Sequence, residues 1–362
     1  MKILLLGEYS NVHNTLAQGL RARGHEVLVV SNGDFWKDYP RDIDVARKPG
    51  KLGGMLLYLK VLRLLPKLRG FDIVQLINPM FFELKAERLF KIYHYLRKWN
   101  KHVVLGAFGM DAYWVKACVE KKFLEYSDFN IGNQLRTDEV AITDRNDWLG
   151  TQKEVLNTLI ANDCDAIVGG LYEDYMAYKF YFPDKLTFIP YPISVGSSSG
   201  ATSHSRVKVL IGINQSRSVY KGTDIMLRAA KEVYMRYADK MSLQVAENVP
   251  FAQYEQLVAE SDILLDQLYS YTPAMNALLA MSKGVVVVGG GEEAQYDLMG
   301  ESELRPIANV KPTQESVERV LTDIVNSPEK LLKMKFESIA YIKRHHEVQH
   351  VAAKYEQLYH SL

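Results

Sequence analysis

The sequence of residues 262–288 is DILLDQLYSYTPAMNALLAMSKGVVVV, and it contains a complete strand–helix–strand pattern. A short apolar run ends in polar residues at Asp266, Pro273 opens a helix, and Gly284 ends that helix before a second apolar run. Two strands joined by a helix in this way run parallel, in a sheet that is covered on both faces. The stretch therefore predicts an α/β fold.

The same alternation continues on both sides of this stretch. In the second half it predicts strands at 207–211, 241–245, 263–265 and 285–288, with helices at 223–238, 251–261 and 273–281. In the first half it predicts strands at 3–6, 26–30, 71–76, 102–105, 165–168 and 186–189, with a helix at 14–23 and another through 93–99. The chain thus reads as two doubly wound, Rossmann-like domains.

A polar stretch separates the two halves. Residues 196–203 read GSSSGATS, which is too poor in apolar side chains to pack and is typical of a hinge. A chain of 362 residues is also long enough for two hydrophobic cores. We expect a first domain at 1–193, a flexible linker at 194–205, a second domain at 206–340 and a closing helix at 341–362.

Composition excludes several classes of protein. Lys and Arg number 44 against 43 Asp and Glu, which gives no electrostatic case for a nucleic-acid partner. The two cysteines, Cys118 and Cys164, are isolated and fit a reducing compartment. The apolar opening of the chain stops at Gly7, too early for a targeting signal or a membrane span, and predicts a first strand. We expect a cytoplasmic protein.

The strongest local signal is the sequence RSVYKGTD at 217–224. Arg217 and Lys221 flank a loop, and Gly222 precedes the next helix. Cationic side chains at a helix start suit a diphosphate, because charged donors and backbone N–H groups together stabilise adjacent phosphoryl groups. The alternative is a solvated loop that only begins a helix.

A second candidate anion site follows the strand at 263–265. The turn at 272–276 should place helical N–H groups at the edge of the sheet. Its expected ligand-binding residues are Thr272, Ala274, Met275 and Asn276.

At this point the sequence resembles the retaining glycosyltransferases of family 4, which have the GT-B architecture. The resemblance covers almost the whole chain. Its landmarks are Gly7-Glu8-Tyr9-Ser10, Phe71-Asp72-Ile73-Val74, Gly109-Met110-Asp111, Ile189-Pro190-Tyr191-Pro192-Ile193, Lys221-Gly222 and Ala280-Met281-Ser282-Lys283-Gly284. It implies a GT-B fold of two Rossmann-like domains facing a cleft, with an acceptor-side N-terminal domain, a nucleotide-sugar-binding C-terminal domain, and a C-terminal helix that crosses back to the N-terminal domain.

The resemblance also implies roles for individual residues. Arg217 and Lys221 would hold the donor diphosphate, and Asp266 and Gln267 would lie by the donor sugar or acceptor. The base would be read near 246–250, which includes Asn248. Partners would be a nucleotide-sugar donor and a glycan or lipid-linked glycan acceptor. No cofactor or metal is expected beyond the donor.

The sequence departs from the family pattern at the chemical step. Phe108 stands where the family has a histidine, and Tyr271 and Leu279 stand where it has two glutamates. Retaining transfer in this family is thought to use the departing phosphate oxygen to take the acceptor proton, so a protein base is optional. The main prediction is a hexosyl-type transferase in polysaccharide biosynthesis. The alternative is a catalytically silent GT-B protein that binds a glycan or a partner. A nucleotide-sugar epimerase would need acid and base groups that we do not find.

Two further residues, Asp111 and His13, have two interpretations each, and Gly7 is a further candidate for donor binding. Asp111 is a candidate catalytic residue that orients an acceptor hydroxyl, or it caps the helix that follows. Gly7 and His13 lie on the predicted first strand-to-helix loop, where His13 contacts acceptor or phosphate, or is a surface or cap residue. The histidines at 345, 346 and 350 lack partners at metal-ligand spacing, which favours a solvated helix face.

Residues 41–69 combine eight Lys and Arg with two acidic residues and many leucines. A basic amphipathic stretch of this kind contacts an anionic membrane surface at its periphery. The alternative is a crossover helix on the sheet with a solvated basic face.

Overall fold

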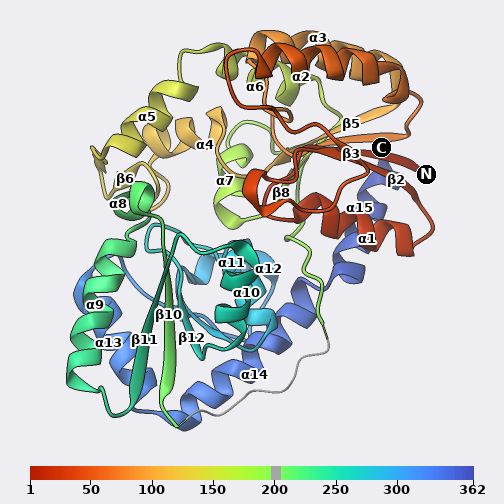
Figure 1. Ribbon diagram of the computed structural model, residues 1–362. Helices are drawn as coiled ribbons and strands as arrows, with labels where there is room; N and C mark the ends of the chain where they lie inside the picture. The colour runs from red at the N-terminus through yellow and green to blue at the C-terminus, as the bar shows by residue number, and fades with distance from the viewer. Residues whose placement is uncertain (197–204) are drawn as a thin grey trace. The chain divides into compact units, whose positions relative to one another are not determined.

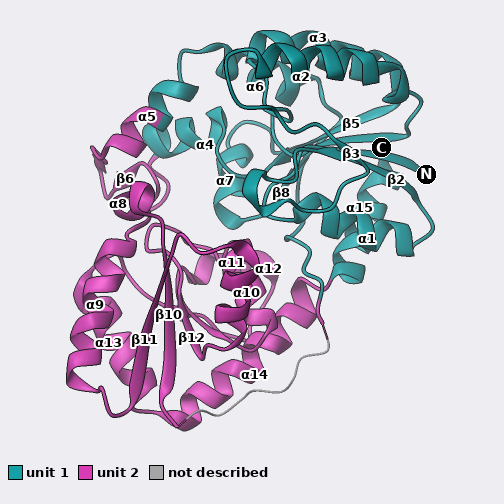
Figure 2. Cartoon of the chain, in the orientation of Figure 1, with its two compact units in different colours: residues 1–121, 144–194, 348–362 teal, residues 122–143, 195–347 magenta. Residues whose placement is uncertain are grey.

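The computed structural model describes residues 1–196 and 205–362, which form two compact α/β units. Figure 2 shows them in two colours: unit 1 comprises residues 1–121, 144–194 and 348–362, and unit 2 comprises residues 122–143 and 195–347. Most of the predicted linker, residues 197–204, lies outside the described residues. The units differ from the predicted domains in that segment 122–143 groups with unit 2.

Unit 1 is built on a parallel sheet of seven strands in the order β3-β2-β1-β4-β5-β8-β9. The strands are β1 (Lys2–Leu6), β2 (Glu26–Ser31), β3 (Ile43–Asp44), β4 (Ile73–Leu76), β5 (His102–Ala107), β8 (Ala166–Gly169) and β9 (Leu186–Phe188). All six strands predicted in this half are present. The sequence did not predict β3, a strand of only two residues.

Helices cover both faces of this sheet (Figure 1). They are α1 (Val12–Ala22), α2 (Gly53–Leu64), α3 (Ala86–Trp99), α4 (Ala112–Lys116), α6 (Gln152–Asp163), α7 (Tyr172–Lys179) and α15 (Val348–Ser361), with α5 (Glu139–Trp148) at the boundary with segment 122–143, short 3-10 turns at Phe35–Lys37 and Leu65–Lys67, and a π-helical turn at Ala117–Lys121. Leu4 and Leu6 of β1 join the core under α2, α3 and α6. Since strand side chains alternate, Ile3 and Leu5 are buried on the other face. The C-terminal helix α15 packs against α1, so it returns to unit 1 as predicted.

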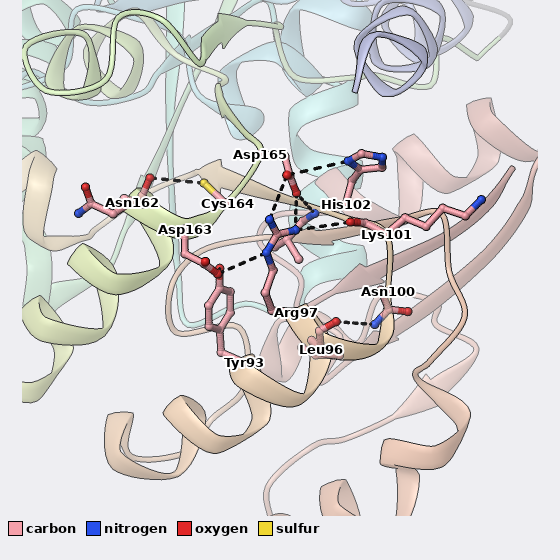
Figure 3. Close-up of polar contacts among 12 residues, drawn as sticks. Tyr93, Leu96, Arg97, Asn100, Lys101, His102, Asn162, Asp163, Cys164 and Asp165 are labelled. Carbon is pink, nitrogen blue, oxygen red and sulfur yellow. Dashed lines mark hydrogen bonds and ion pairs between the residues drawn. The ribbon is translucent and has the colours of Figure 1, made fainter.

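A polar cluster fixes the amino-terminal ends of β5 and β8 (Figure 3). Arg97 of α3 donates two hydrogen bonds to the carboxylate of Asp165, at 2.7 and 3.1 Å. Asp165 also accepts from the backbone N–H of Val103 at 2.7 Å. The hydroxyl of Tyr93 donates to Asp163 at 2.7 Å, which ties α3 to the end of α6. These groups lie at the edge opposite the strands' carboxyl ends, so we assign them to stability.

Unit 2 repeats the design with a parallel sheet of five strands in the order β11-β10-β12-β13-β14. The strands are β10 (Val207–Ile213), β11 (Met241–Glu247), β12 (Ile263–Leu265), β13 (Val286–Gly289) and β14 (Ala308–Asn309), and the helices are α8 (Ser218–Lys221), α9 (Thr223–Arg236), α10 (Phe251–Ala259), α11 (Met275–Ser282), α12 (Glu293–Met299), α13 (Gln314–Val325) and α14 (Pro328–His345), with a 3-10 turn at Gln215–Arg217. Apolar residues of α9, α13 and α14 form the core on one face. Helices α10, α11 and α12 lie on the other (Figure 1).

The direction in which successive strands are added to the unit 2 sheet reverses beside β10. The chain leaves β10 through α9 to β11 on one side, and β12 pairs with β10 on the other side. Ligands of open α/β sheets bind at such a reversal, outside the carboxyl ends of the strands. In unit 2 this position belongs to the loops at 214–222 and 266–274.

Among the helices formed by residues 1–196 and 205–362, none combines the length and the apolar character that crossing a bilayer requires.

Candidate functional site

The first part of the candidate site is the turn between β10 and α9. Gly222 ends α8 and precedes α9 with φ +73°, a left-handed conformation that favours glycine. A Cβ at this position would lie 2.8 Å from Cβ of Leu268. The backbone N–H of Leu268 donates to the carbonyl of Lys221 at 3.0 Å. Glycine thus lets the turn after β10 pack against the loop after β12.

The structure brings together three of the predicted site residues at this edge. The amide of Asn276, in the first turn of α11, donates to Oδ1 of Asp266 at 2.9 Å. Burial raises the pKa of Asp266, while the hydrogen bond from Asn276 and the positive charge of Lys221 act against that rise. Lys221 itself is exposed. The site therefore combines an exposed cation, a half-buried carboxyl group and the first turn of a helix.

Arg217 lies one α-helical turn before Lys221 and is also exposed. Its guanidinium lies over the ring of Tyr220, 4.9 Å from the ring centre. Tyr220 is buried, so it forms a fixed platform for this side chain. Both cations predicted to hold a diphosphate are thus on the surface of unit 2, at the carboxyl end of β10.

The turn before α11 is held by its own polar groups. The hydroxyl of Ser270 donates to the carbonyl of Thr272 at 2.7 Å and accepts from the N–H of Thr272. The helix begins at Met275, two residues later than predicted. Ala274 precedes it without a side-chain cap. The first N–H groups of α11 therefore receive no side-chain acceptor from the N-cap position.

The remaining predicted donor residues lie on neighbouring loops. Gln267 is half-buried directly after β12. Asn248 is exposed after β11 and has φ +54°, an uncommon conformation that asparagine tolerates better than most residues. Both residues therefore lie at the carboxyl edge of the unit 2 sheet, as Lys221 and Asp266 do.

Arg136, which the sequence did not single out, contacts this site from segment 122–143. Its guanidinium donates to the carbonyl oxygens of Tyr220 at 2.8 Å and Val219 at 3.0 Å. It also pairs with Asp138 at 3.2 Å and lies over the ring of Tyr269, 3.8 Å from its centre. The side chain is 5% exposed. Arg136 therefore holds the turn that carries Arg217 and Lys221.

Other side chains of the same segment contact the ends of later strands. The hydroxyl of Tyr126 donates to Glu292 after β13 at 2.5 Å, and its ring lies 4.9 Å from that of Tyr271. Lys311, after β14, bridges Glu292 at 3.0 Å and Glu125 at 3.1 Å. Segment 122–143, which includes the hairpin β6 (Asn130–Ile131) and β7 (Gln134–Leu135), thus borders the carboxyl edge of the unit 2 sheet.

Tyr254 of α10 is a second residue that the sequence did not single out. It hydrogen-bonds with Asn276, and burial raises its pKa to about 12. Its ring lies beside Gly212, where a Cβ would be 3.1 Å from a ring carbon. Its one sequence signal is the glycine inside β10, because a glycine within a strand often marks a close approach.

In unit 1, the predicted position of His13 was wrong. It lies in the first turn of α1, directly after a turn that ends at Asn11 with φ +71°, and it is fully buried. Its Nδ1 lies 2.9 Å from the carbonyl oxygen of Gly7, and its Nε2 lies 3.2 Å from the amide nitrogen of Gln75. Burial lowers the pKa of His13 to about 3. Both ring nitrogens are thus engaged inside unit 1.

Gly7 and Glu8 shape the start of the same helix. Gly7 has φ +83°, and a Cβ there would lie 2.3 Å from Cγ2 of Ile77. Both carboxyl oxygens of Glu8 accept backbone N–H groups, from His13 at 3.1 Å and Asn14 at 2.8 Å. Burial raises the pKa of Glu8 to about 8, against these hydrogen bonds. Glu8 thus caps the start of α1, and Gly7 lets the chain pass close to Ile77.

Asp111 adopts the capping role that the sequence left open. It precedes α4, accepts from the N–H of Trp114 at 2.8 Å and accepts from the hydroxyl of Tyr178 at 2.7 Å. Burial raises its pKa to about 6. Phe108, where the resemblance implied a histidine, is buried with its ring 5.2 Å from that of Tyr191.

In the part of the chain that the structure describes, no group of three or more His, Cys, Asp or Glu side chains is placed to hold a metal ion. The solvated face expected for the C-terminal histidines was wrong for two of them. His345 and His346 are buried beside Tyr341, and Nε2 of His345 lies 2.6 Å from Glu301. Tertiary packing buries these two side chains, which the helical pattern alone placed on the solvent-exposed face.

Comparison with known proteins addresses the fold. No family model matches the chain, and no curated protein matches its sequence. The structure of HepE from Anabaena in complex with UDP and glucose matches over 100% of both chains, at 13% identity and a TM-score of 0.63. Sucrose-phosphate synthase from Thermosynechococcus elongatus matches over 100% of this chain and 98% of its own, at 12% identity and 0.63. WaaG, a glycosyltransferase involved in lipopolysaccharide biosynthesis, matches over 98% of both, at 14% identity and 0.52.

At sequence identities of 12 to 14%, the structural similarity is evidence for the fold alone. The two parallel sheets, the C-terminal helix that returns to unit 1 and the full-length matches agree with one another. The chain has the GT-B fold.

Proposed function

We propose that this protein is a glycosyltransferase that takes a sugar from a nucleotide diphosphate donor bound by unit 2. One observation carries the proposal: Lys221, Asp266 and Asn276 meet where the strand order of the unit 2 sheet reverses. HepE, with the same fold, binds UDP and UDP-glucose, and this supports a similar donor here.

The proposed chemistry assigns a task to each group. Lys221 and Arg217 stabilise the negative charge that grows on the leaving diphosphate as the bond from the anomeric carbon to the phosphate oxygen breaks. The first N–H groups of α11 add a positive end of a helix dipole. Asp266 accepts hydrogen bonds from sugar hydroxyls. In a retaining reaction, the acceptor oxygen bonds to the anomeric carbon from the same face and its proton passes to the leaving oxygen.

The test is calorimetric titration with nucleoside diphosphates of different bases. Lys221→Ala should weaken binding about ten- to a hundredfold, the loss expected for one charge-assisted contact to phosphate. Lys231→Ala, which removes an exposed cation from the outside of α9, is the matched control and should bind like wild type. Absence of diphosphate binding by wild type would contradict the proposal.

The silent alternative is favoured by Phe108, because it leaves no imidazole at the family position. It predicts diphosphate binding without sugar transfer. Incubation with nucleotide sugars and glycan or lipid-linked acceptors, with analysis of the anomeric configuration of any product, separates the two. Transfer that is lost in Lys221→Ala excludes silence, and the product's configuration tests retention.

A further inference from the structure

Helix α2 of unit 1 is apolar on two opposite faces. Its inner face contributes Leu57 and Val61 to the core of unit 1. Its outer face carries large apolar side chains that are exposed by 36 to 73%: Leu52, Met55, Leu56, Leu59 and Leu62. These five residues recur at spacings of three and four, so they form one continuous stripe along the helix. Clustering of this kind is unusual, since monomeric proteins scatter their exposed apolar side chains.

Positive charge surrounds this stripe. Between Asp44 and Asp72 the chain has no acidic residue, and it has seven cationic ones, all exposed: Arg47, Lys48, Lys51, Lys60, Arg63, Lys67 and Arg69. Lys60 contacts Asp44 at 3.8 Å, and the structure gives no ion pair for the other six side chains. On a helical projection of α2, Arg63 falls within the stripe and Lys60 beside one edge, while Lys51 precedes the helix and Lys67 follows it.

The rest of unit 1 holds α2 firmly, with its stripe outward. Arg88 of α3 donates to the carbonyl of Gly54 at 2.6 Å and lies over the ring of Tyr58, 5.1 Å from its centre. Figure 1 shows α2 beside α3 in one helical layer. The stripe is therefore not a core face that a small rotation of the helix could bury.

We propose that the outer face of α2 docks on an anionic membrane surface. The helix has 12 residues and is thus about 18 Å long, too short to cross a bilayer but suited to lie in its interface. The leucines and Met55 enter the boundary between headgroups and acyl chains, and the surrounding Lys and Arg side chains reach anionic headgroups. This placement explains why the stripe is apolar and why the chain has no acidic residue between Asp44 and Asp72. It does not depend on the function proposed above.

The experiment is co-sedimentation of the full chain with lipid vesicles. Vesicles of equal parts phosphatidylcholine and phosphatidylglycerol should bind the protein, and pure phosphatidylcholine vesicles should bind it at least about tenfold less, because each cation near an anionic surface adds to the attraction. Higher salt should weaken the binding by screening.

Two double variants separate the contributions. Leu56→Glu with Leu59→Glu should lower the partition coefficient at least about tenfold, because it brings negative charge into the interface. Arg63→Glu with Lys67→Glu should lower it to a similar degree and weaken its salt dependence. The matched control is Met235→Glu with Phe336→Glu, which replaces equally exposed apolar residues of unit 2 and should leave vesicle binding unchanged.

Thermal unfolding should be similar in all variants, since the replaced side chains are exposed. Three results would overturn the proposal: no binding of wild type to anionic vesicles, equal binding of wild type and Leu56→Glu/Leu59→Glu, or equal binding to charged and neutral vesicles. Sedimentation velocity provides a fourth. A wild-type dimer that the leucine variant converts to monomer would assign the stripe to a second copy of the chain.

Discussion

Replacement of Arg136 tests whether segment 122–143 organises the candidate diphosphate site. Lysine keeps the positive charge, but its single ammonium cannot reproduce the two-pronged contact with the carbonyl oxygens of Val219 and Tyr220. It also loses the planar contact with the ring of Tyr269. Arg136→Lys should therefore loosen the turn without removing any group that is proposed to contact the ligand.

The magnitude follows from these contacts. Hydrogen bonds from a charged donor contribute about 1.5–3 kcal/mol each, and lysine should lose one of the two. If about half of that lost energy must be spent on ordering the turn when the ligand binds, the binding free energy for a nucleoside diphosphate weakens by about 1 kcal/mol. The affinity then falls roughly fivefold. Arg136→Ala should cost more, about 2–4 kcal/mol of unfolding free energy, because it leaves the carbonyl oxygens of Val219 and Tyr220 without this buried donor.

The assay is calorimetry with the nucleoside diphosphate that wild type binds, and with the corresponding monophosphate. The ratio of the diphosphate affinity to the monophosphate affinity should fall in Arg136→Lys, because the turn carries Arg217 and Lys221, the two cations proposed to hold the diphosphate. Arg228→Lys, on the exposed side of α9, is the control. An unchanged ratio in Arg136→Lys, together with a clear loss in Lys221→Ala, would refute the reasoning and leave Arg136 a purely structural residue.

Three further predictions concern unit 1. Burial raises the pKa of Glu8 from 4.5 to about 8, so the folded state binds its proton more tightly than the unfolded state. The contribution of Glu8 to stability should be fully present below pH 4.5 and be lost as pH rises to about 8, by up to about 5 kcal/mol, and urea unfolding of Glu8→Gln should lack this component of the pH dependence. Gly7→Ala should lower the unfolding free energy by about 1–3 kcal/mol, because the new methyl group collides with Ile77 and the residue keeps a positive φ; an unchanged melting temperature would contradict this. Arg97→Ala should cost about 1–2 kcal/mol by breaking its partly exposed pair with Asp165, with nucleotide binding unaffected.

Short-range patterns in the sequence were sufficient to predict most of the fold. The apolar runs at 207–211 and 263–265 became β10 and β12, because a strand buried on both faces needs consecutive apolar residues. The two-residue strands β3 and β14 were missed, since two residues carry no periodicity.

The candidate site was predicted less completely. Lys221 and Asp266 could be singled out because each lies between a predicted strand of unit 2 and the next predicted helix, where parallel strands bring their carboxyl ends to one edge. Arg136 could not, since its partner Tyr220 lies 84 positions away and no pattern links the two. The loop position predicted for His13 was wrong because the length of a turn depends on backbone angles that the sequence leaves open.

The sequence by itself determined the two parallel sheets and the cations beside the first turn of the second one, because helix and strand periodicity and the residues that end them act over a few positions. Only the tertiary structure decided that segment 122–143 belongs with unit 2, that His13 is enclosed, and that the apolar stripe of α2 remains uncovered. These features depend on which surfaces meet after the chain has folded. Contacts between residues far apart in the chain decide that, and local patterns do not record them.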